Sequence, residues 1–172
     1  WDSGVTDNTS FIPAIGPQTY TVTGTDGSGC SDNSTILVTV NPLPPATIAT
    51  SQAACFNGTI PDLFAIGSTP NWYSDAVLTN YLFTGNNFAT GETAVGLYTY
   101  YVTETLNGCE GPSVPVTLDI YSLPTVTANA SLASPLCAGE NLILTGSGTA
   151  TTYTWDSGVT DNTSFIPAIG PQ

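Results

Sequence analysis

The sequence of 172 residues contains no lysine, arginine, histidine or methionine. Thirteen aspartates and glutamates are its charged side chains, and the net charge is −13. Ordinary soluble chains devote about a quarter of their residues to charges of both signs. Because the sequence offers no cationic side chain, salt bridges between side chains are excluded. The fold must therefore depend on apolar burial, backbone hydrogen bonds and disulfides.

The missing basic residues exclude several classes of function. Nucleic-acid binding needs lysine and arginine near phosphates, and a polybasic patch for anionic lipids is impossible. Without lysine there is no Schiff base, and without histidine the commonest general base and transition-metal ligand is missing. We therefore expect no enzyme activity, no catalytic residue and no cofactor, and no nucleic-acid partner.

Long apolar runs are also absent from the sequence. No stretch reaches the roughly 20 apolar residues that a membrane-spanning helix needs. We therefore expect no direct membrane insertion. Four cysteines are present, which suits an oxidising compartment.

The chain repeats its own beginning. Residues Trp1–Gln18 return letter for letter as Trp155–Gln172, which sets a repeat of 154 residues. An identity of that length indicates one full unit with an overlap, taken from a longer tandem array. We expect any export signal or anchor to lie outside this sequence.

Two joints that contain proline divide the unit, at Asn41–Pro45 and Tyr121–Pro124. We predict a complete module at residues 43–123. Residues 1–42 are then the C-terminal part of a second module. Residues 124–172 are the N-terminal part of the next copy of that second module.

The two modules are distant copies of each other. Trp72 of the complete module corresponds to Trp1 and Trp155 of the divided one. In each module a tyrosine-rich segment then leads to a Gly-Cys pair, which ends at Cys30 in one and Cys109 in the other. The array therefore alternates two related modules, A and B.

Composition and turn signals favour an all-β fold. Threonine, valine, tyrosine and isoleucine are abundant between glycine, proline and asparagine turns, as in strands of a β-sandwich. No segment has helical periodicity, so we predict no helix longer than about two turns, or roughly seven residues. Asn107-Gly108 predicts a tight hairpin. The expected strands lie near 47–51, 62–66, 71–74, 80–84, 97–106 and 113–122, and near 125–130, 141–146, 151–155, 10–13, 18–25 and 34–41.

The order Cys…Trp…Cys in each module resembles that of immunoglobulin-like (Ig-like) sandwiches. Here the second cysteine follows the hairpin after the tyrosine-rich strand, whereas in antibody domains it lies within that strand. The resemblance implies a disulfide between Cys55 and Cys109 inside the complete module. Cys30 and Cys137 would each bond to the neighbouring repeat copy, Cys137 to the next unit's equivalent of Cys30.

Two further features allow a binding role. We expect the tryptophan side chains to lie in the core, at Trp72, Trp1 and Trp155. The alternative is that these side chains form a surface on which sugars stack. The segment Asp26–Asp32 is rich in oxygen ligands and could hold Ca²⁺, although it lacks EF-hand spacing and is first of all a turn.

Two stretches of the sequence resemble a known family. Tyr100–Cys109 followed by Pro115–Ile120, and Leu136–Thr145 followed by Tyr153–Trp155, are similar to the Ig-like and PKD-like tandem repeats of large secreted surface proteins of the Bacteroidota. The resemblance implies export as type IX secretion cargo and a role as an adhesin or surface filament. It implies no catalytic residue in these modules.

We therefore expect a structural repeat of an extracellular fibre, stalk or surface filament, with neighbouring copies of the same repeat as its partners. The alternative is an adhesive or carbohydrate-binding surface repeat that grips a glycan or another surface ligand. A binding module of that kind should expose an aromatic cluster on one face.

Overall fold

The computed structural model describes residues 1–2 and 4–168. Their regular structure is β, apart from one 3-10 helix of three residues, η1 (Asp156–Gly158). The prediction of an all-β fold is therefore confirmed. No helix in the described part is long and apolar enough to cross a membrane. The chain divides into two compact units, Trp1–Ile120 and Tyr121–Gln172.

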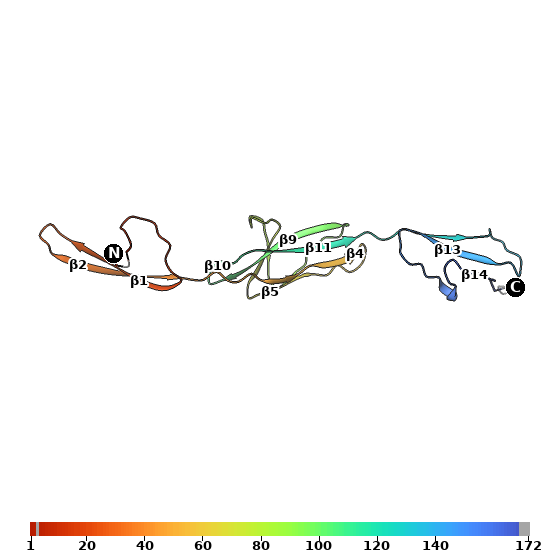
Figure 1. Cartoon of the computed structure of the whole chain (residues 1–172), viewed down its shortest axis with the longest axis horizontal. Coiled ribbons are helices and arrows are strands. Elements are labelled where there is room, and N and C mark those ends of the chain that lie inside the picture. The colour runs from red at the N-terminus through yellow and green to blue at the C-terminus, as the bar shows by residue number, and fades with distance from the viewer. Residues whose placement is uncertain (3, 169–172) are drawn as a thin grey trace. The chain divides into compact units, whose positions relative to one another are not determined.

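Two sheets form the complete module within the first unit (Figure 1). The larger sheet has the strand order β4-β11-β9-β6-β7, with β10 paired to β9, and the smaller sheet has the order β3-β5-β8. The strands are β3 (Ile48–Thr50), β4 (Gln52–Cys55), β5 (Leu63–Ile66), β6 (Pro70–Tyr73), β7 (Tyr81–Thr84), β8 (Asn87–Phe88), β9 (Gly96–Leu106), β10 (Cys109–Glu110) and β11 (Val114–Tyr121).

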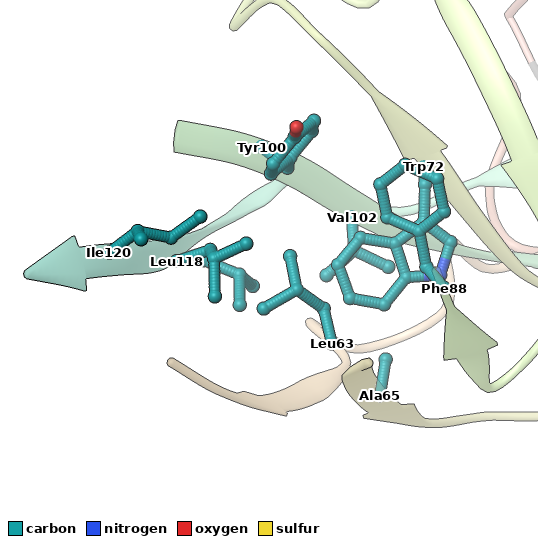
Figure 2. Close-up of a cluster of buried hydrophobic side chains, with 9 residues drawn as sticks. Leu63, Ala65, Trp72, Phe88, Tyr100, Val102, Leu118 and Ile120 are labelled. Carbon is teal, nitrogen blue, oxygen red and sulfur yellow. The ribbon is translucent and has the colours of Figure 1, made fainter. Parts of the chain in front are cut away.

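The core lies between these two sheets (Figure 2). Alternate residues of β11 point inward, because successive side chains of a strand face opposite sides of a sheet. Trp72 is fully buried and contacts Phe88, with ring centroids 5.3 Å apart. The buried cluster comprises Leu63 and Ala65 of β5, Phe88 of β8, and Trp72, Tyr100, Val102, Val116, Leu118 and Ile120 of the larger sheet.

The hairpin between β9 and β10 turns at the predicted dipeptide. Asn107 has a φ of 51° and Gly108 a φ of 78°. Two central residues with positive φ are the signature of the turn that matches the right-handed twist of hairpin strands. The Asn-Gly prediction is confirmed, and the turn places Cys109 opposite Leu106.

Residues before the complete module form a long hairpin. Strand β1 (Gly16–Thr25) pairs antiparallel with β2 (Ser31–Val40), with Gly16 opposite Val40 and Tyr20 opposite Ile36. This pair corresponds to β9 and β11 of the complete module, where Tyr100 lies opposite Val116.

The second unit is a small sheet with the strand order β12-β13-β14. Its strands are β12 (Val126–Ala130), β13 (Leu142–Gly148) and β14 (Ser164–Phe165). Leu142 lies opposite Phe165, just as Leu63 lies opposite Phe88 in the complete module. This sheet therefore corresponds to β3-β5-β8.

Two expected strands are not formed, at residues 10–13 and 151–155. In the complete module, Trp72 of β6 pairs with Val102 of β9. Residues 151–155 have no strand of that kind beside them in the second unit. The segment at 10–13 likewise lacks a partner, whereas its second copy, β14, has β13 beside it and forms a strand. Strand formation therefore depends on the neighbour as much as on the sequence.

Candidate functional site

The hairpin β1-β2 carries an apolar face that no second sheet covers in the part of the chain that the structure describes. A groove of about 150 Å³ on this face is lined by Trp1, Val5, Phe11, Tyr20, Ile36 and Val38. Ile36 is 54% exposed, whereas Val116, which occupies the equivalent position in the complete module, is 1% exposed. The difference arises because β5 and β8 cover Val116 in the complete module, and no equivalent strands cover Ile36.

The second unit lacks a partner for the other of the two sheets. Its sheet corresponds to the smaller sheet of the complete module, but no equivalent of β9 and β11 lies among its described residues, up to residue 168. A groove of about 240 Å³ follows this uncovered side, lined by Val126, Thr127, Ala128, Gly146, Thr152, Tyr153, Thr154 and Trp155. Tyr153 lies so close to Gly146 that a side chain on Gly146 would collide with its ring.

Two local features of the repeated segment recur in its two copies. The indole Nε1 of Trp1 donates to Asp7 Oδ1 at 3.1 Å, and that of Trp155 donates to Asp161 Oδ1 at 2.7 Å. Asn8 has a φ of 58° and its copy Asn162 a φ of 56°. Residues 169–172, the last of the second copy, lie outside the described residues. The turn at Asp7-Asn8 therefore recurs at Asp161-Asn162, whereas residues 164–165 form a strand and residues 10–11 do not.

The tryptophan of the complete module does not serve as a surface platform. Trp72 has 0% exposure, and its Nε1 donates to the carbonyl oxygen of Gly85 at 2.8 Å. The prediction that this residue belongs to the core is confirmed. Exposed aromatic side chains do occur on the edge strand β7, at Tyr81 and Phe83.

Acidic side chains in the complete module hold buried phenols and backbone amides. The hydroxyls of Tyr73 and Thr103 donate to Glu110 Oε1 at 2.7 and 2.6 Å. Glu104 Oε1 accepts the backbone N–H groups of Ser68 and Thr69 at 3.0 and 2.9 Å. With no cationic side chain in the sequence, Oε1 of each glutamate is held by neutral donors, whereas Glu104 Oε2 is buried without a hydrogen-bond partner.

Burial raises the pKa of Tyr73 to about 12, and the hydrogen bond to Glu110 adds to the shift. Burial and the hydrogen bond to Glu92 likewise raise the pKa of Tyr100 to about 12. Between the ordinary value of 10.0 and about 12, the folded state holds protons that the unfolded state has lost. These two groups therefore contribute stability that is complete below pH 10 and is lost as the pH rises to about 12.

We expect the phenolate absorbance of the folded protein to show two tyrosines that ionise near pH 12 rather than near pH 10. The free energy of unfolding should fall between these two pH values. Tyr73→Phe and Tyr100→Phe should each remove one late titration. If both phenols of the folded protein ionise near pH 10, their burial beside Glu110 and Glu92 is contradicted.

The candidate Ca²⁺ segment is a self-contained turn. Asp26 Oδ1 accepts the backbone N–H groups of Ser28 and Cys30 at 2.8 and 2.9 Å. Asp32 Oδ1 accepts the N–H of Asn33. Within the described residues, no group of three or more acidic or cysteine side chains is placed to hold a metal ion. The Asp26 carboxylate therefore binds the backbone of its own loop, as expected of a turn.

The structure does not bring Cys55 and Cys109 together. All four cysteines are unbonded; Cys30, Cys55 and Cys137 are exposed and Cys109 is half-buried. Cys55 ends β4 and Cys109 begins β10, and Figure 1 shows these strands at opposite ends of the complete module. β3 and β4 carry the chain away from the end at which the β9-β10 hairpin lies, and the bond between Cys55 and Cys109 stays a prediction.

Comparison with known proteins agrees with the two-sheet architecture. Residues 43–121 match the family described as Ig-like domain CHU_C associated. No curated protein matches the chain. Domains of this family are non-catalytic, occur in secreted surface proteins and are typical of their repeats. Residues 43–121 thus form an Ig-like domain, similar to the family described as CHU_C associated.

Proposed function

We propose that the chain is a structural repeat of an extracellular fibre, stalk or surface filament. In this array, Ig-like modules of two kinds alternate along the polypeptide. The observation that carries the proposal is the pair of uncovered apolar faces, one on the β1-β2 hairpin and one on the β12-β13-β14 sheet.

Each of the two sheets corresponds to the sheet that the other one lacks as a partner. Tyr20 and Ile36 occupy the positions of Tyr100 and Val116 in the larger sheet of the Ig-like domain. Leu142 and Phe165 occupy the positions of Leu63 and Phe88 in its smaller sheet. A copy of residues 124–154 placed before Trp1 would therefore supply the counterparts of β12 and β13, and Phe11, the copy of Phe165, would complete the missing sheet. Burial of apolar surface at about 25 cal/mol per Å² then favours completion of the module.

The charge distribution supports an extracellular array. A net charge of −13 without a single basic side chain keeps neighbouring chains apart and soluble. The same composition leaves stability to burial and backbone pairing, which each module supplies within itself. Stability that comes from the modules themselves supports a mechanical role.

The shape of tandem chains tests this proposal. Chains of one, two and three 154-residue units should give particles whose longest dimension, measured by electron microscopy or small-angle X-ray scattering, grows by a constant increment per unit. A particle that stays compact as units are added would overturn the array. Denatured chains of equal length are the control for growth that reflects only chain length.

A further inference from the structure

We propose that the cysteines form disulfides across the joints between modules rather than inside them. Cys109 bonds to the copy of Cys137 in the preceding repeat. This pairing leaves Cys55 to bond with the copy of Cys30 in the following repeat. The inference rests on the proposed tandem array, because each bond needs a residue from a neighbouring copy.

The joint at Asn41–Pro45 lies against one end of the Ig-like domain, called here the leading end. The side-chain Nδ2 of Asn41 donates to the carbonyl oxygen of Asn107 at 3.2 Å. Pro44 is buried, and a side chain on Gly111 would meet its carbonyl oxygen at 2.7 Å. The hairpin that carries Cys109 therefore lies at the leading end. Cys109 Sγ itself is 4.0 Å from the carbonyl oxygen of Asn41.

Cys55 lies at the other end of the domain, called the trailing end. Strand β3 starts at Ile48, which shares a cavity with Pro44 and Glu104 at the leading end. From there β3 and β4 carry the chain away from the joint. Strand β11 runs in the same direction, since it follows Gly111 and ends at Tyr121.

These two strands lie side by side in the larger sheet. The N–H of Thr117 in β11 donates to the side chain of Ser51, the residue before β4, at 3.0 Å. Continued along both strands, this register places Cys55, the last residue of β4, at the level of the final residues of β11.

The same placement applies to the divided module. Strand β2 corresponds to β11, and Asn41 occupies the position of Tyr121, each being two residues before a Leu-Pro pair. Strands β12 and β13 pair as β3 and β5 do, so Cys137 occupies the position of Cys55. In a completed module, the copy of Cys137 therefore comes beside Asn41. That is the residue whose carbonyl oxygen contacts Cys109, so two cysteines from successive modules meet at one joint.

Oxidation is a balanced exchange with a disulfide oxidant such as oxidised glutathione. The two thiols lose two protons and two electrons and form one S–S bond, while the oxidant is reduced to two thiols. Exposure of three of the four cysteines leaves them accessible to such a reagent. A bond across each joint would restrict bending there, where otherwise only the short proline segment does so.

Mass spectrometry of the 172-residue chain after treatment with oxidised glutathione gives the first test. This chain carries neither the preceding copy of Cys137 nor the following copy of Cys30, so its monomer should take up glutathione as mixed disulfides and form no bond between two of its own cysteines. A bond between Cys55 and Cys109 in the monomer would overturn the proposal.

Disulfide mapping of a three-unit chain gives the second test. After digestion with chymotrypsin and an acid-specific protease, we expect linked peptides that join Cys109 to Cys137 and Cys30 to Cys55. Peptides that join Cys55 to Cys109 and Cys30 to Cys137, or fully free thiols, would overturn the proposal.

Two matched variants separate the pairings. Cys109→Ser should free Cys137 and leave the bond between Cys30 and Cys55 intact, whereas Cys55→Ser should do the reverse. If Cys109→Ser frees Cys55 instead, the bonds lie inside modules. A three-unit chain that is elongated but bonded within modules defeats only this inference. A compact three-unit particle defeats the array itself.

Discussion

Replacement of Trp72 by alanine should destabilise the Ig-like domain by about 3–5 kcal/mol, the usual cost of truncating a buried tryptophan or phenylalanine. Trp72 is fully buried and contacts Phe88 between the two sheets. Its removal leaves a cavity that neighbouring side chains cannot fill, and it leaves the carbonyl oxygen of Gly85 without its indole donor. Small domains are stable by about 5–15 kcal/mol, so the variant should lose much of its stability.

Urea unfolding followed by circular dichroism measures this effect. Trp1→Ala is the matched control, because Trp1 occupies the equivalent position but lies outside the Ig-like domain and is 42% exposed. We expect this control to change the unfolding free energy of the Ig-like domain by less than about 0.5 kcal/mol. Equal losses in the two variants would contradict the core assigned to Trp72.

Addition of a copy of residues 124–154 ahead of Trp1 should convert the β1-β2 hairpin into part of a complete module. An isolated two-stranded hairpin is at best marginally stable in water, and the apolar face around Phe11 and Ile36 is exposed. The added sheet would cover that face. A complete module with at least about 5 kcal/mol of stability protects its amides roughly a thousandfold more than an open hairpin does.

Hydrogen exchange of β1 and β2 measures this protection. The Ig-like domain within the same molecule provides an internal reference, since its exchange should not change. An added copy that carries Leu142→Asp is the control, because Leu142 is buried at the position equivalent to Leu63 and an unpaired carboxylate there would oppose sheet packing. Unchanged exchange in β1 and β2 on addition of the native copy would contradict the divided module.

Strand chemistry and turn chemistry were sufficient to predict much of this fold. The all-β class follows from alternating β-branched and aromatic residues, and Asn107-Gly108 specifies its hairpin through the positive φ that both residues adopt. The core role of Trp72 follows from its recurrence at one position in both modules. These features are local or periodic, so neighbouring residues determine them without reference to distant strands.

Strand pairing, by contrast, depends on which segments lie side by side. Residues 151–155 have strand composition but form no strand, because no partner strand lies beside them in the second unit. Residues 164–165 do form one, because β13 provides their hydrogen bonds. Short strands gain their stability from cross-strand contacts, and sequence composition alone does not reveal those contacts.

The sequence by itself determined the repeat, the absence of side-chain salt bridges and the β character of both modules. The placement of the cysteines required the tertiary structure. The order Cys…Trp…Cys is the same whether two cysteines lie at one end of a sandwich or at opposite ends. That choice depends on the direction in which β4 runs beside β11, and a long-range pairing of that kind sets Cys55 at one end of the domain and Cys109 at the other.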